Sequence, residues 1–206
     1  RMSVSEGAVQ GKGRRQLVLL VVLFLVPPLG AWVAWQVMGE QGVAVTTNAG
    51  QLISPARPLA FSNLRDPDGA TVDVSTLRGR WTYVMFDDGS CATERCDDQL
   101  YLTRQTRLAM NKDVERVQRL LVLDATPSPA LRRRLDDQHP DLRWVVLGAD
   151  AEALLNSFAG KGFDATGRSF FLVDPLGNLM MAYDLEVPAK GLMKDLQKLL
   201  KVSQIG

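Results

Sequence analysis

The hydrophobic positions of the chain begin with one long uninterrupted run. From residue 17 to residue 35 no side chain is charged or polar, and the apolar run continues past Gln36 to Met38. A membrane's hydrocarbon core needs roughly 20 helical residues to cross it, whereas the apolar core of a cleaved signal peptide has only about 7–15. Trp32 and Trp35, near the end of the run, favour the membrane interface. The pattern therefore predicts an uncleaved transmembrane helix over residues 16–38.

Downstream, short apolar strands alternate with helical stretches. Strands are predicted over residues 81–86, 120–124, 143–147, 169–173 and 179–183. Helices are predicted from the cysteines to Met110, over 130–137, over 151–158 with Asp150 as N-cap, and over 192–200. Turns at residues 66–69 and 174–178 indicate hairpins. This order is typical of a three-layer, thioredoxin-like α/β domain, and the initial hairpin and extra helix resemble its peroxiredoxin and Sco branch.

The charges beside the apolar run predict its orientation. Lys12, Arg14 and Arg15 directly precede it, whereas residues 39–56 contain only Glu40 as a charged side chain. Basic residues stay on the cytoplasmic side of a membrane. We therefore predict a cytoplasmic tail (1–15), a stalk (39–57) and one domain (58–206), which in a bacterium is periplasmic and anchored to the inner membrane.

Overall composition narrows the class of function. The formal net charge is +1 and no basic stripe appears outside the tail, which argues against a nucleic-acid partner. The sequence contains nothing that resembles a hydrolase triad, a phosphate loop or a dinucleotide site. Two cysteines in an oxidising compartment are compatible with a disulfide or a metal site.

These cysteines, Cys91 and Cys96, are the candidate functional residues. They follow the first central strand at the start of a helix, where the helix N-terminus favours a thiolate. Four residues separate them, so they can meet only if Cys91 lies in the loop ahead of the helix. Acidic residues around them disfavour a thiolate, and Arg95 is the only cation nearby in sequence. The acidic residues are Asp87, Asp88, Glu94, Asp97 and Asp98. A structural disulfide, thiols that hold Cu(I) or Zn(II), and a catalytic redox pair all remain open.

The predicted anchor, the strand ending at Phe86, the cysteine pair and the stretch 171–177 together resemble the Sco/SenC family. Nearly the whole chain from residue 14 on is also similar to a little-characterised proteobacterial group of membrane proteins associated with cytochrome c oxidase assembly; residues 172–181 and 194–204 carry that second resemblance. The resemblance implies copper binding or redox chemistry at Cys91 and Cys96, with an oxidase subunit or a copper chaperone as partner.

This sequence departs from the Sco pattern in two places. Sco proteins have three residues between the cysteines and usually a proline after the second, whereas here there are four and then Asp97. Sco proteins also use a histidine shortly before the final hairpin, where this chain has residues 164–166 and no histidine. Only Cys91 and Cys96 can therefore be carried over as copper ligands.

Other chemically active residues have ordinary structural explanations. His139 is the only histidine and is expected in an exposed loop. Met180 and Met181 lie on a predicted strand, whose alternation sends them to opposite faces, so at least one belongs to the core. A further cluster on the helix after the cysteines is expected to be a solvated face or a partner contact; it consists of Tyr101, Arg104 and Arg107.

Three functions follow from these observations. The first is a membrane-anchored accessory factor in cytochrome c oxidase biogenesis, acting by copper handling or thiol maintenance. The second is a periplasmic thiol–disulfide oxidoreductase. The third is a non-catalytic assembly scaffold, in which the cysteines form only a structural disulfide.

Overall fold

The computed structural model describes residues 10–39, 48–60, 64–72, 74–149, 152–166 and 168–203, which belong to two compact units divided after Val45. The first unit contains one long helix, α1 (Gln10–Gly39). Its segment Gly13–Val33 is long and apolar enough to cross a membrane, and no part of that segment is buried against other residues. Helix α1 is thus a candidate membrane-spanning helix.

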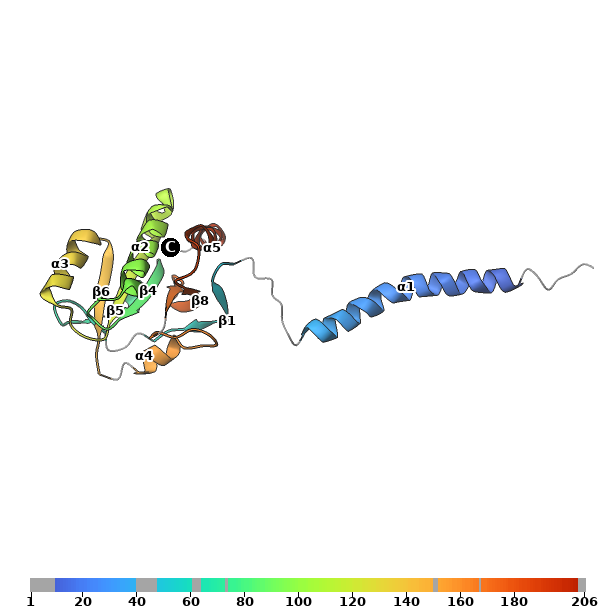
Figure 1. Cartoon of the computed structure of the whole chain (residues 1–206), viewed down its shortest axis with the longest axis horizontal. Coiled ribbons are helices and arrows are strands. Elements are labelled where there is room, and N and C mark those ends of the chain that lie inside the picture. The colour runs from blue at the N-terminus through green and yellow to red at the C-terminus, as the bar shows by residue number, and fades with distance from the viewer. Residues whose placement is uncertain are drawn as a thin grey trace, which may run out of the picture. The chain divides into compact units, whose positions relative to one another are not determined.

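The second unit is built on one eight-stranded mixed sheet (Figure 1). The strand order is β1-β8-β7-β4-β5-β6-β2-β3. The strands are β1 (Gln51–Pro58), β2 (Leu64–Arg65), β3 (Thr71–Val72), β4 (Trp81–Asp87), β5 (Val117–Leu123), β6 (Leu142–Leu147), β7 (Ser169–Val173) and β8 (Asn178–Asp184). Strands β4, β5 and β6 are parallel, and the other pairings are antiparallel.

Helices cover both faces of this sheet. They are α2 (Glu94–Leu108), α3 (Pro129–Gln138), α4 (Glu152–Ser157) and α5 (Ala189–Val202), with the short 3₁₀ helices η1 (Val74–Leu77) and η2 (Asn111–Arg116). Figure 1 shows α2, α3 and α5 on one side of the sheet and α4 on the other. The result is the predicted three-layer, thioredoxin-like α/β fold.

Strand alternation explains the two cores. Every residue of β4 is buried, and successive side chains point to opposite faces. Tyr83 and Met85 therefore join the core beneath α2 and α5, whereas Val84 and Phe86 join the core on the side of α4. In that second core Phe86, Phe158 and Phe171 pack edge to face, an arrangement that aromatic rings favour.

The sheet contains one strand that was not predicted and one that begins earlier than predicted. Strand β1 pairs with β8, so the sheet begins within the segment that the sequence assigns to the stalk. Strand β5 starts at Val117 rather than at residue 120. Its polar residues Gln118 and Arg119 are buried, so the hydrophobic pattern does not mark this part of the strand. Asp150, the predicted N-cap of α4, lies outside the described residues.

Candidate functional site

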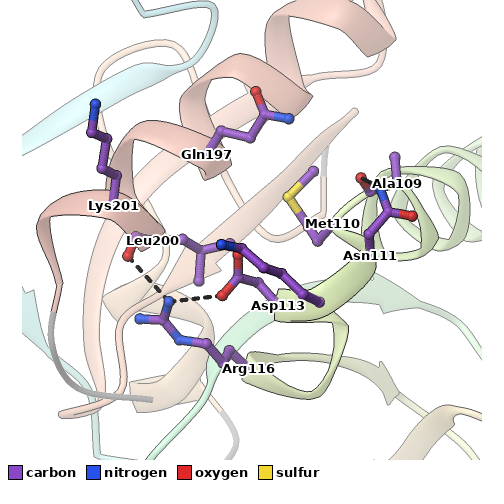
Figure 2. A pocket seen from close by; sticks show the side chains of 9 residues that line it. Ala109, Met110, Asn111, Asp113, Arg116, Gln197, Leu200 and Lys201 are labelled. Atoms are coloured by element: carbon purple, nitrogen blue, oxygen red, sulfur yellow. Dashed lines mark hydrogen bonds and ion pairs between the residues drawn. The ribbon is translucent and has the colours of Figure 1, made fainter.

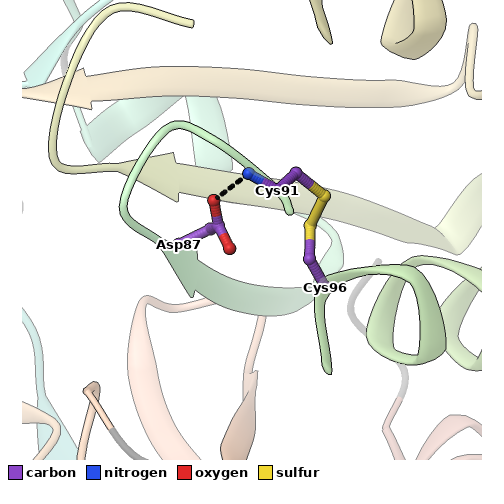
Figure 3. A group of neighbouring side chains, drawn as sticks. All are labelled: Asp87, Cys91 and Cys96. Atoms are coloured by element: carbon purple, nitrogen blue, oxygen red, sulfur yellow. Dashed lines mark hydrogen bonds between the residues drawn. A yellow bond between two sulfur atoms is a disulfide. The ribbon is translucent and has the colours of Figure 1, made fainter. Parts of the chain in front are cut away.

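The two cysteines are joined by a disulfide at the carboxyl end of β4 (Figure 3). Cys91 lies in the loop after the strand and Cys96 in the first turn of α2, with their Cα atoms 5.3 Å apart. The backbone of Cys91 has a φ of +44°, in the left-handed region that few residues other than glycine adopt. This turn brings Cys91 back towards the helix, which is the loop placement that the spacing requires.

Both cysteines are enclosed by the core. Cys91 is 3% exposed and Cys96 is 2% exposed, and both pack among the side chains beneath α2 and α5. Exchange with another thiol needs an approach to one sulfur atom. The loop between Asp87 and Cys96 must therefore move before a protein partner can react with this disulfide.

The carboxylate of Asp87 lies directly beside the disulfide. One of its oxygens and the two sulfur atoms all lie within 4.8 Å of one another. Asp87 Oδ1 accepts hydrogen bonds from the backbone N–H groups of Gly89 (3.0 Å) and Cys91 (2.8 Å). Burial raises the pKa of Asp87, although the two N–H bonds act in the opposite direction. A carboxyl group whose pKa is raised above the ordinary value thus adjoins both sulfurs.

Two arginines from different helices hold this loop in place. Arg95, from α2, donates hydrogen bonds to the carbonyl oxygens of Phe86 (3.3 Å) and Thr166 (3.0 Å), and its Nη2 is 3.9 Å from Asp87 Oδ2. Arg134, from α3, donates to the carbonyl oxygen of Cys91 at 3.3 Å. Arg95 can be identified from its position between the cysteines, but Arg134 cannot, because no local motif links residues 43 positions apart.

The remaining candidate residues lie outside the disulfide site. His139 caps the end of α3 and is half-buried rather than exposed, and burial lowers its pKa. Met181 is a core residue whose sulfur accepts the hydroxyl of Tyr183 at 3.1 Å. Arg107 is bound to the carbonyl oxygen of Val117 at 2.8 Å, so it is part of the packing rather than a solvated face.

Comparison with known proteins identifies the domain. A family model described as "Transmembrane-like, thioredoxin-like, C-terminal domain" matches residues 81–203, which is more than half of the chain. The chain belongs to this family. No curated protein matches the chain.

The fold of this domain is similar to those of solved Sco and thiol:disulfide interchange proteins. ScoI of Bradyrhizobium japonicum with copper bound is 19% identical, with a TM-score of 0.53, and the match covers 68% of this chain and 98% of that one. A thiol:disulfide interchange protein from Bacteroides sp. is 16% identical, with a TM-score of 0.54 and coverages of 74% and 93%. BsSco, described as a member of the Sco family of cytochrome c oxidase assembly proteins with a disulfide switch, is 17% identical, with a TM-score of 0.54 and coverages of 74% and 99%. These likenesses show the shared fold.

The ligand atoms at the site can be compared with the preferences of copper. Two thiolates, once the disulfide is reduced, are soft ligands that suit Cu(I). Asp87 is a hard ligand, and one of its oxygens already accepts two backbone N–H groups. Where Sco proteins are expected to provide a histidine, this chain has residues 164–166 and no histidine, and the carbonyl oxygen of Thr166 is bound by Arg95. The residues therefore fit Cu(I) held by two sulfurs, without a good third ligand.

A separate hollow of about 490 Å³ lies at the other end of α2 (Figure 2). The residues around it come from the end of α2, from η2 and from α5. Arg116 occupies its wall, bound to Asp113 (3.1 Å) and to the carbonyl oxygen of Leu200 (3.2 Å). The length of α2 places this hollow about 20 Å from the disulfide, so it is not part of that site.

Proposed function

We propose that the protein is a membrane-anchored, thioredoxin-like accessory factor in cytochrome c oxidase biogenesis, and that it acts by thiol–disulfide exchange at Cys91 and Cys96. The observation that carries this proposal is the disulfide itself, placed between the central strand and the N-terminus of α2 beside a carboxyl of raised pKa. Fold likeness to BsSco and to an interchange protein supports the link to oxidase assembly and to thiol chemistry.

The exchange would proceed in two balanced steps. In the reduced protein, the thiolate of one cysteine attacks a partner disulfide; a mixed disulfide forms and one partner thiolate leaves. The second cysteine attacks the mixed disulfide, so the Cys91–Cys96 bond forms and the second partner thiolate leaves. Two electrons pass to the partner, and the two cysteine protons pass to its thiolates. A thiol reductant of the same compartment then restores the dithiol.

Asp87 would handle a proton in these steps. One of its carboxylate oxygens lies within 4.8 Å of both sulfur atoms, and a nearby base can accept the thiol proton directly or through one water when the thiolate forms. Because burial raises the pKa of Asp87, the group is a better proton acceptor than an ordinary carboxylate. When it is protonated, it also no longer repels the developing thiolate.

The anchor completes the proposal. We place residues 1–15 in the cytoplasm and the membrane span at residues 16–38 of α1, with the domain in the periplasm. The apolar segment of α1 and the basic residues before it support this arrangement. An oxidising compartment is also where a protein disulfide persists.

Two measurements test the thiol role. The Cys91–Cys96 disulfide of the full chain, in detergent, should equilibrate with glutathione at a potential above about −300 mV, whereas structural disulfides usually lie below it. In cells, Cys91→Ser and Cys96→Ser should lower oxidase activity, with protein level as the control. Normal oxidase activity after both cysteines are replaced would instead indicate a scaffold.

Copper handling is the second candidate function, because reduction of the Cys91–Cys96 bond would leave two soft thiolates side by side. In this version Cu(I) is cargo held by the two thiolates and passed to an oxidase subunit or received from a copper chaperone. The reduced chain should then bind one Cu(I), measured by competition with a chromophoric Cu(I) chelator. Cys96→Ser should abolish this binding and Asp87→Asn should leave it unchanged.

A further inference from the structure

A polar groove of about 690 Å³ lies between α2 and α3, beside the disulfide loop. Helix α2 contributes Asp97, Tyr101 and Arg104 to the groove. The opposite wall is formed by Arg134, Asp137 and Gln138 of α3 and by His139 at its end. A hollow of this size accepts a ligand as large as a few peptide residues, which is much more than one small anion needs.

Several polar groups of the groove are not satisfied by the rest of the protein. Arg104 is half-buried and forms no hydrogen bond or ion pair with any residue that the structure describes. The Nδ1 atom of His139 is buried and has no hydrogen-bond partner within the described part of the chain. Tyr101 is 66% exposed and offers a hydroxyl and a ring. Buried or half-buried donors without partners favour a ligand that supplies acceptors.

Positive charge also lies behind the groove. Arg119 is fully buried and shares Asp141 with Arg107, at 3.2 Å and 3.6 Å. Arg104 and Arg119 are near enough to His139 to lower its pKa, after burial, which is the main cause. The groove also carries the exposed carboxylates of Asp97 and Asp137, and Asp97 is paired with Arg134. The unpaired guanidinium of Arg104 is therefore the group that would bind an incoming carboxylate.

Arg134 connects this groove to the disulfide. One of its nitrogens is 3.3 Å from Asp97 Oδ1 and 3.3 Å from the carbonyl oxygen of Cys91. Asp97 is 63% exposed, so water weakens its hold on the arginine. A carboxylate brought into the groove would compete with Asp97 for Arg134 and would draw its guanidinium away from Cys91.

We propose that the α2–α3 groove docks an acidic polypeptide segment of the redox partner, and that docking releases Arg134 from Cys91 and so uncovers the disulfide. Arg104 binds a carboxylate of the segment, and Tyr101 and His139 contact the adjoining backbone. The inference rests on the proposed function only in calling the occupant a redox partner. It explains how a disulfide with almost no exposed surface can react with a protein thiol at the moment of contact.

A binding measurement tests the docking step. Two fluorescein-labelled peptides of the same length, one rich in Glu and one with Gln at the same positions, are titrated with the full chain in detergent. The Glu peptide should bind at least about tenfold more tightly, which corresponds to about 1.4 kcal/mol. Arg104→Glu should remove this preference. Arg133→Glu, which makes the same charge change at an exposed α3 residue outside the groove, should keep it.

Equal binding of the two peptides, or equal losses in Arg104→Glu and Arg133→Glu, would overturn the docking site. Thermal unfolding of each variant verifies that it is folded, and Arg104→Gln replaces Arg104→Glu if the latter is not. This result does not depend on thiol chemistry. A failed oxidase test with Cys91→Ser would therefore contradict the proposed function while the groove still binds the peptide.

A rate measurement tests the link to the disulfide. Reduction of the Cys91–Cys96 bond by a phosphine is followed by alkylation and mass spectrometry, with and without the Glu peptide. The peptide should accelerate reduction several-fold in the wild type. Arg134→Gln should react faster without peptide and should gain nothing from its addition. A wild-type rate that the bound peptide does not change would overturn the role of Arg134.

Discussion

Asp87 has two roles in the loop that carries the disulfide. It ends β4 and binds the N–H groups that shape the loop, and its carboxylate adjoins the two sulfur atoms. The sequence indicates a crowd of acidic side chains around the thiols, but several of these are engaged elsewhere: Asp88 accepts the N–H of Ser90 and Asp97 pairs with Arg134. Asp87 is the carboxylate beside both sulfur atoms, so its charge contributes directly to the field that opposes a thiolate.

Asp87→Asn should remove a pH dependence of stability. Because the folded pKa of Asp87 is raised, the folded state keeps this proton to a higher pH than the unfolded chain does. The stability that results is fully present below the unfolded pKa of about 3.9 and is lost as pH rises through the folded pKa. Asn retains the oxygen that accepts both N–H groups and does not titrate. Relative to the variant, the wild type should lose thermal stability as the pH rises above about 4, until the folded pKa of Asp87 is passed.

Thermal unfolding of the full chain in detergent, measured from pH 4 to pH 8, tests this prediction. Asp88→Asn is the matched control, because hydrogen bonding to Ser90 lowers the pKa of Asp88 and its titration has the opposite sign. Parallel curves for the wild type and Asp87→Asn would show that the folded pKa of Asp87 is ordinary.

Arg119 is the charged residue most enclosed by the domain. Its guanidinium donates to Asp141, to the carbonyl oxygen of Leu100 (2.7 Å) and to the hydroxyl of Thr103 (3.1 Å). Arg119→Met removes the donor of these hydrogen bonds and leaves Asp141 with Arg107 as its ion-pair partner. Breaking a buried pair typically costs about 3–5 kcal/mol. Asp141 is 21% exposed and can be hydrated, so we expect the lower end, about 3 kcal/mol.

Urea unfolding measures this loss. The double variant Arg119→Met/Asp141→Asn provides the control, since it removes the charge of Asp141 as well and should be more stable than Arg119→Met alone. If Arg119→Met unfolds at the same urea concentration as the wild type, the buried arginine contributes no net stability.

At the scale of elements, the hydrophobic pattern predicted those strands and helices that bury a continuous run or face of apolar side chains. Residues 81–86 and 169–173 are almost wholly apolar, and the structure has β4 and β7 there. Strand β1 was missed because it lies at the edge of the sheet, contains two prolines and is mostly exposed, so no apolar alternation marks it. The start of β5 was missed because Gln118 and Arg119 are buried polar residues, which a hydrophobic pattern cannot detect.

The disulfide site, like the sheet, was predictable from sequence only where local patterns determine it. The positions of Cys91 and Cys96 after a central strand follow from local sequence. Arg134 and the groove depend on how α3 packs beside α2, and no spacing along the chain encodes that contact. The acidic neighbours of the thiols could be identified from sequence, whereas the pairing of Asp97 with Arg134 could not.

The edge strand β1 is fastened by a side chain of α5. Asp195 is 2% exposed, and its Oδ2 accepts the N–H groups of Ala49 (2.8 Å) and Gly50 (3.0 Å) just before the strand. Asp195→Ala would leave two amides without an acceptor, and such losses cost about 1–3 kcal/mol each when the group stays buried. Because the edge can open to water, we expect about 2 kcal/mol and local rather than global opening.

Hydrogen exchange of the full chain measures this effect. Amides of residues 49–58 should exchange faster in Asp195→Ala, while those of β4 and β5 keep their protection. Asp195→Asn, which retains one acceptor oxygen, should be intermediate. Unchanged exchange at residues 49–58 would mean that pairing with β8 alone holds the strand.

For the whole molecule, compartment decides how the cysteines should be interpreted. A disulfide persists in an oxidising compartment and is rare in the cytosol, so the proposed thiol role requires the domain to be exported. Fold likeness to Sco and interchange proteins does not provide this information. The location of the domain therefore depends on α1 and on the basic residues before it.

A fusion of alkaline phosphatase after Ser203 tests the anchor and its orientation, because this enzyme becomes active only where its own disulfides can form. The fusion should be active and should sediment with membranes. Leu23 lies within the apolar segment of α1, and replacing Leu by Arg at the centre of a membrane helix costs about 3–4 kcal/mol of insertion free energy. Leu23→Arg should therefore reduce both activity and membrane association, whereas Leu176→Arg, at an exposed position of the domain, should change neither. An inactive wild-type fusion that still sediments with membranes would reverse the orientation and place the disulfide in a reducing compartment, where a thiol-maintenance role outside the cytoplasm is excluded.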